Sequence, residues 1–168
     1  MRIVAALGAI LLALAVQTTL AGLVIRGTAA VDLVLIVVVY IALKFGPVTG
    51  VVAGTVAGLL QDSLSSGILG IGGLAKTIVA FVSGVLGTQF ILTGPLPRFV
   101  LLLMATALHA LIFIGLYVLL DLRDFPSPVP AVVGQALGNA FVGVVTFQFI
   151  EWLPGFIDGR RNRRPLKR

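Results

Sequence analysis

The chain has 168 residues, of which 59% are hydrophobic and 11% charged, and its mean hydropathy is +1.16. A soluble domain of this length cannot bury that much apolar surface, so the composition excludes a water-soluble globular protein and predicts one membrane-embedded bundle. The absence of cysteine also excludes disulfides, thiolate metal sites and cysteine nucleophiles.

The net charge of +6 comes largely from the carboxy-terminal end. Six cations lie in the last nine residues: Arg160, Arg161, Arg163, Arg164, Lys167 and Arg168. A basic cluster that follows a membrane helix is typical of a cytoplasmic end that meets anionic lipid headgroups. We therefore expect membrane lipids, and no nucleic acid, as the partners of this cluster.

Hydropathy predicts an all-α membrane protein with six transmembrane helices. The expected helices are at about 3–25, 28–43, 47–61, 74–93, 99–120 and 130–153, and a basic cytoplasmic tail follows at 156–168. The first segment has 23 uncharged residues between Arg2 and Arg26, which is enough to cross a hydrocarbon core of about 30 Å. A cleaved signal peptide is the alternative, but the stretch is long for one and favours a retained helix.

The second and third segments form an expected helical hairpin. Pro47 ends one helix and starts the next. Gly46, Gly50, Gly54 and Gly58 recur at intervals of four, which places them along one helix face. This spacing predicts close packing against a neighbouring helix.

An irregular, glycine-rich connection is expected at 63–73, between the third and fourth segments. Asp62 precedes it and Lys76 follows it. A carboxylate at a membrane boundary is costly unless it is solvated or paired, so we expect these two side chains to form an ion pair or to anchor the loop. The alternative is that both simply face water. Gly70-Ile-Gly-Gly-Leu-Ala75 matches a dinucleotide-binding fingerprint only by accident, because membrane helices flank it.

Three polar positions lie inside the later segments. His109 is the only ionisable group of the fifth; a hydrogen bond to a neighbouring helix is a better interpretation than a proton relay or a protease dyad with Ser83. Gln135 and Asn139 share a face of the sixth segment, where either interhelical packing or a polar ligand cavity explains them. We expect no catalytic residue, cofactor or metal.

The distribution of charge predicts that both termini are cytoplasmic. In this orientation the cytoplasmic segments hold Arg2, Lys44, Arg98 and the six tail cations, and the opposite side holds Arg26, Lys76 and Arg123. The positive-inside rule thus supports an even number of crossings, in agreement with six.

The stretch Gly50-Val-Val-Ala-Gly-Thr-Val-Ala-Gly-Leu-Leu-Gln-Asp62-Ser-Leu, followed by Gly67-Ile-Leu-Gly70 and Gly73-Leu-Ala-Lys76, resembles the MreD family of rod shape-determining membrane proteins. The specific motif covers about 50–76; elsewhere the resemblance lies in length, hydropathy and the basic end. Asp62, Gly67 and Gly70 match the acid-and-glycine pattern of the family, and Lys76 falls where a basic residue is common. The resemblance implies that they form a loop site that faces a partner.

The resemblance further implies a non-enzymatic scaffold of the cell-elongation machinery in the bacterial inner membrane. Its implied partner is MreC, with RodA, a penicillin-binding transpeptidase and MreB filaments around that pair. The family is also similar in fold to the substrate-binding membrane subunits of vitamin-uptake transporters. A small-molecule uptake subunit is therefore the alternative function.

Overall fold

A computed structural model describes residues 2–21, 31–65, 68–90, 94–122 and 127–161. Every regular element in these ranges is an α-helix: α1 (Arg2–Ala21), α2 (Leu33–Phe45), α3 (Pro47–Leu64), α4 (Ile71–Gln89), α5 (Pro95–Leu119) and α6 (Val129–Arg161). The prediction of an all-α membrane protein is confirmed. Gly67, Arg163 and Arg164 lie outside the described residues.

Local chemistry fixes where several helices begin. Asp32 caps α2, because its side chain accepts a hydrogen bond from the backbone N–H of Leu35. Gly46 (φ +90°) and Gly70 (φ +103°) precede α3 and α4, and both adopt a backbone conformation that strains other residues. Pro47 occupies the first turn of α3, where its missing N–H costs no helical hydrogen bond.

Several boundaries differ from the expected ones; α5, for example, begins at Pro95 rather than near 99. Helix α2 begins at Leu33 rather than near 28. Helix α4 begins at Ile71 rather than near 74, so Gly72 and Gly73 belong to its first turn and the irregular connection is shorter than 63–73. Helix α6 continues to Arg161 instead of ending near 153.

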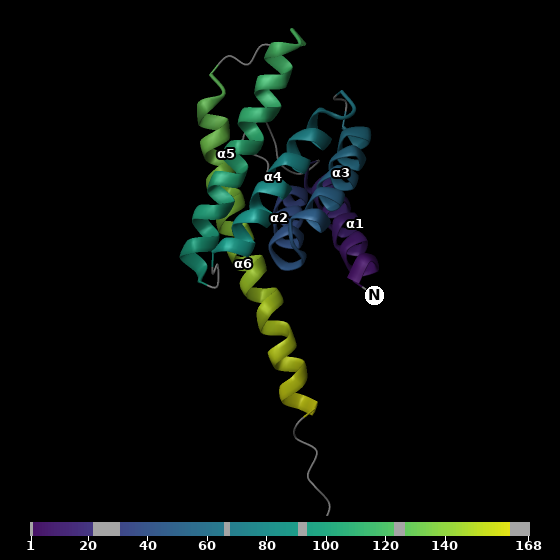
Figure 1. Cartoon of the computed structure of the whole chain (residues 1–168), viewed down its shortest axis with the longest axis vertical. Coiled ribbons are helices and arrows are strands. Elements are labelled where there is room, and N and C mark those ends of the chain that lie inside the picture. Colours follow the sequence, from purple (N-terminus) through teal and green to yellow (C-terminus); the bar gives the residue numbers. More distant parts are fainter. Residues whose placement is uncertain (1, 22–30, 66–67, 91–93, 123–126, 162–168) are drawn as a thin grey trace, which may run out of the picture.

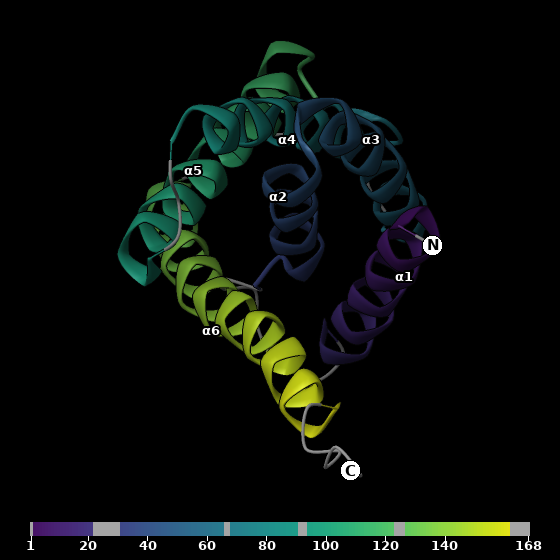
Figure 2. The ribbon, with the colours of Figure 1, turned by 60° about the horizontal axis from the view of Figure 1, so that its bottom comes forward.

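Helix α2 lies in the middle of the bundle, with the other five helices around it (Figures 1 and 2). Seven of its 13 residues are buried: Val34, Leu35, Ile36, Val38, Val39, Ile41 and Ala42. A helix that is apolar on nearly every side is stable only where other apolar groups surround it. Within the described residues α2 contacts all five neighbours, whereas α1 and α6 do not contact each other.

Glycines allow the closest helix pair, α3 and α4, to approach. A Cβ atom added at Gly54 would lie 2.8 Å from the carbonyl oxygen of Lys76, and one added at Gly50 would lie 2.6 Å from Cβ of Ala42 on α2. One added at Gly58 would collide with the backbone of Gly73. A Cβ atom added at Gly46 would meet nothing within 4 Å, so this residue serves the turn and does not belong to the packing face.

Three described helices are long and apolar enough to cross a membrane: α4, α5 and the part of α6 from Val129 to Trp152. Shorter apolar stretches cover Ala6–Thr19 and Leu33–Phe45. Large apolar side chains such as Met104, Leu111 and Phe141 are more than 60% exposed on the outside of the bundle, where lipid can cover them. These features agree with a membrane protein, and six crossings remain a prediction.

Candidate functional site

Three ionisable side chains from different helices meet inside the bundle. Nζ of Lys76 on α4 lies 2.8 Å from Oδ2 of Asp32 at the start of α2, and 3.2 Å from Nε2 of His109 on α5. All three residues are buried, with 3%, 4% and 8% of their surface exposed for Lys76, Asp32 and His109. Because an ammonium group only donates hydrogen bonds, Nε2 must accept, which requires a neutral imidazole. We call these residues the buried triad.

Asn139 joins α6 to the triad. Its Oδ1 accepts a hydrogen bond from the backbone N–H of Asp32 at 2.8 Å, and its Nδ2 donates to Oγ1 of Thr106 on α5 at 3.0 Å. Asn139 is fully buried. Hydrogen bonds between helices in an apolar environment fix the relative positions of the helices, because a polar group that loses its partner there stays unsatisfied. For Asn139 the geometry corresponds to interhelical packing.

Asp62 binds backbone rather than a cation. Its Oδ2 accepts hydrogen bonds from the N–H groups of Gly70 at 2.9 Å and Gly73 at 3.0 Å, at the start of α4. A carboxylate there satisfies unpaired N–H groups and interacts with the positive end of the helix dipole. The expected Asp62–Lys76 ion pair is wrong, because Lys76 contacts Asp32 and His109 instead. The expectation that Asp62 anchors the loop is confirmed by its two bonds to backbone N–H groups.

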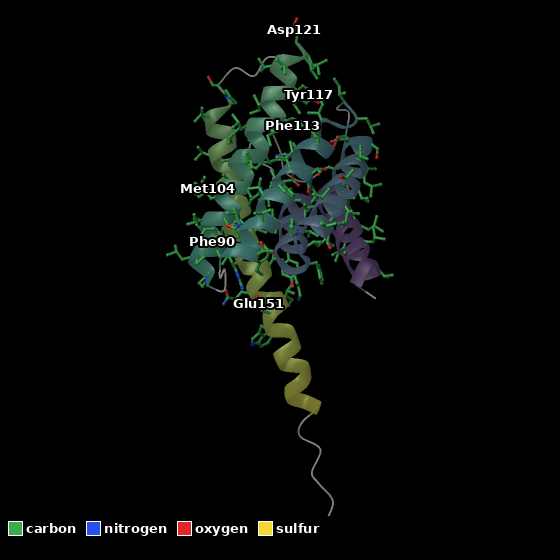
Figure 3. All side chains as sticks on the ribbon, in the orientation of Figure 1. Phe90, Met104, Phe113, Tyr117, Asp121 and Glu151 are labelled. Carbon is green, nitrogen blue, oxygen red and sulfur yellow. The ribbon has the colours of Figure 1, made fainter. Side chains whose placement is uncertain are left out.

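A cavity of about 370 Å³ opens beside the triad, and we call it the triad cavity. Asp32, Lys76 and His109 form one part of its wall, and Gln61, Asp62, Phe113, Tyr117 and Gln135 are among the other residues that line it. Phe113 and Tyr117 lie toward the Asp121 end of the molecule (Figure 3). The structure thus brings Asp62, Lys76, His109 and Gln135 to one cavity, and Gly70 lies next to it through its bond to Asp62.

A second polar cluster lies toward the opposite end, where Figure 3 labels Phe90 and Glu151. The guanidinium of Arg98 on α5 donates two hydrogen bonds to the carboxylate of Glu151 on α6, at 2.6 and 2.8 Å. Arg98 also lies over the ring of Phe147. A cavity of about 450 Å³ is lined here by these residues together with Tyr40 and Lys44. Arg98 lies in the first turn of α5 and links this helix to α6.

The catalytic alternatives find no support in the arrangement of side chains. His109 contacts Lys76 and stacks on Phe113, and Ser83 does not line the triad cavity. In the part of the chain that the structure describes, no group of three His, Asp or Glu side chains could hold a metal ion.

Sequence reasoning missed Asp32 and Glu151 as site residues. Asp32 stood out only as a lone acid in front of an apolar helix, and that was the available signal. An acid in such a position needs a partner, and Lys76 in the fourth predicted segment was a candidate.

Comparison with known proteins agrees with the family resemblance seen in the sequence motif. The family model described as rod shape-determining protein MreD matches residues 1–152. No curated protein and no solved structure gives a significant match. Because the family model covers most of the chain, the protein belongs to the MreD family of rod shape-determining membrane proteins.

Proposed function

We propose that this protein is a non-enzymatic scaffold in the bacterial inner membrane that binds MreC and helps to position peptidoglycan synthesis during cell elongation. The family match over residues 1–152 is the observation that carries this proposal. RodA, a penicillin-binding transpeptidase and MreB filaments are the further proposed members of the assembly. Both termini are proposed to be cytoplasmic.

A seam between α1 and α6 is the proposed docking site for the single membrane helix of MreC. The described residues of α1 and α6 make no contact with each other, although both pack on α2. Leu33, Val37 and Tyr40 recur on one face of α2 and are only half-buried. The face lies between the core residues shared with α1 and those shared with α6. We call this face the α2 seam.

An apolar helix fits this seam because the half-buried face of α2 is largely apolar and lies between α1 and α6. In a membrane such contacts depend on close packing rather than on the hydrophobic effect, since lipid tails are equally apolar. A helix seated there would complete the ring around α2. The polar ends of the bundle would then remain available to other members of the assembly.

Cysteine crosslinking tests the seam directly, because the chain has no cysteine of its own. Val37→Cys is paired with single cysteines along the helix of MreC in a rod-shaped host and then oxidised. We expect crosslinks at Val37 with a helical period. Leu111→Cys is the matched control, because Leu111 is 71% exposed on α5, away from the seam.

Crosslinks at Leu111 but not at Val37 would move the site to another face. Failure of MreC to co-purify, together with normal rods after depletion of the protein, would reject the scaffold itself.

The triad cavity favours a second candidate, a substrate-binding subunit of a vitamin-type uptake transporter. A volume of about 370 Å³ suits a small ligand, and convergent polar groups with aromatic walls are typical of ligand sites. Native mass spectrometry that finds a vitamin bound at one per protein would support this candidate over the scaffold. Purified protein without a vitamin, bound to MreC, would reject it.

A further inference from the structure

The triad cavity combines features of a ligand site that a scaffold does not require. Its volume of about 370 Å³ lies within the range of small-molecule sites. Residues from α3, α4, α5 and α6 line it, so it lies between helices rather than on one surface loop.

Two residues of α3 that line this cavity carry hydrogen-bond acceptors for which the described residues supply no donor. Oε1 of Gln61 is buried and has no hydrogen-bond partner among the described residues. Oδ2 of Asp62 holds Gly70 and Gly73, whereas Oδ1 receives no hydrogen bond from a described residue. The buried oxygen of Gln61 costs free energy while it has no donor, whereas Asp62 is only half-buried and leaves Oδ1 open to a ligand that brings N–H or O–H groups.

The charges around the cavity favour a cation. Lys76 is neutralised by Asp32 at 2.8 Å and donates to a neutral His109, so it offers little charge to an incoming ligand. The carboxylate of Asp62 has no cation beside it in the described structure, and it leaves the wall with a net negative charge. A cation next to Asp62 compensates this charge in a site of low dielectric.

An aromatic wall completes the site. His109, Phe113 and Tyr117 follow one another at intervals of four on α5, with ring centroids 5.9 Å apart for the first pair and 4.8 Å for the second. Ring faces attract cations and also cover the apolar part of a small ligand. The wall and the acceptors of α3 line the same cavity.

From this arrangement we infer that the triad cavity binds a primary ammonium group, with its N–H groups on Gln61 and Asp62 and its attached carbon chain against Phe113 and Tyr117. A primary ammonium has three donors, which is enough for both acceptors. The same chemistry occurs in an aminophospholipid headgroup and in a free amine, and the experiment separates the two.

Short-chain phosphatidylethanolamine, short-chain phosphatidylcholine and ethanolamine are titrated into the purified full-length protein, and binding is followed by native mass spectrometry. Phosphatidylcholine has the same net charge but no N–H donor, so it is the matched control ligand. We expect phosphatidylethanolamine to bind at least tenfold more tightly than phosphatidylcholine. Comparable binding of ethanolamine would identify a free amine as the ligand, and its absence would identify the lipid. Equal binding of both lipids, without ethanolamine, would overturn the inference.

Gln61→Leu is the decisive variant, because it removes an acceptor that no described residue uses. We expect it to weaken binding of the primary ammonium about tenfold and to raise the melting temperature of the ligand-free protein. Gln89→Leu, an exposed position at the other cavity, should change neither. Unchanged binding by Gln61→Leu in folded protein would overturn the assignment of the site. Asp62→Asn, which keeps the side-chain shape, should also weaken binding.

Discussion

Lys76 and Asp32 form an ion pair in the interior of the bundle, with 2.8 Å between Nζ and Oδ2 and with at most 5% of either side chain exposed. The pair joins α4 to the start of α2, the central helix. Two charges removed from water are costly unless each compensates the other, so the pair ties the positions of the two helices to each other.

Lys76→Met should destabilise the protein by about 3–5 kcal/mol, because it leaves the carboxylate of Asp32 buried without a counter-charge. The double variant Asp32→Asn with Lys76→Met should recover most of this loss. Asparagine retains the cap on the N–H of Leu35, and the site then holds no charge. Thermal unfolding of the purified protein measures both effects.

Lys44→Met is the matched control for that experiment. Lys44 is exposed and bonds only to Tyr40 among the contacts described, so its loss should cost less than about 1 kcal/mol. A double variant that is as unstable as Lys76→Met would argue against charge compensation as the reason for the pairing.

His109→Gln should leave both stability and cell shape nearly unchanged, because the glutamine amide can accept the hydrogen bond that Lys76 now donates to Nε2. His109→Leu should cost about 1–3 kcal/mol, since it removes that acceptor. Unfolding and complementation of a depletion strain are measured on the same variants. Round cells with well-expressed His109→Gln would instead indicate a proton-transfer role for the imidazole.

Local features of the fold could be predicted from the sequence better than the side-chain contacts between helices. The break at Pro47 and the glycine spacing through Gly58 depend on neighbours along one helix, and these features could be read from the sequence. The partner of Lys76 depends on which helix occupies the centre. Asp62 was the acid nearest to Lys76 along the chain, but its carboxylate accepts hydrogen bonds from backbone N–H groups at the start of α4 instead.

The central position of α2 had a signal in the sequence that was not used. Its residues from Leu33 to Ala42 are apolar in every direction apart from Tyr40, which is typical of a helix enclosed by others. With α2 in the centre, Asp32 at its start has to be buried. The cavity could not be predicted, because it depends on how α3, α5 and α6 pack around that end.

Gly54→Ala should destabilise the bundle by about 1–3 kcal/mol, because the added methyl group would lie 2.8 Å from the backbone oxygen of Lys76 and would force α3 and α4 apart. Gly115→Ala is the control, since nothing lies within 4 Å of a Cβ atom there and alanine favours a helix. Melting temperatures of the two variants should therefore move in opposite directions. A Gly54→Ala protein as stable as the Gly115→Ala protein would contradict the close packing of α3 on α4.

Cysteines at the two ends of the bundle should react from opposite sides of the membrane. Figure 3 shows Asp121 at one end of the molecule, with Phe90 and Glu151 toward the other. The orientation predicted from the basic residues puts the Asp121 end outside. Leu122→Cys should therefore react with a membrane-impermeant maleimide in intact spheroplasts, and Phe90→Cys only after permeabilisation.

Both side chains are exposed, with 43% of the surface of Leu122 and 59% of that of Phe90 accessible, so poor access does not explain a difference in labelling between them. The reverse pattern of labelling would place both termini outside, and labelling of both positions in intact spheroplasts would contradict a bundle that crosses the membrane between them.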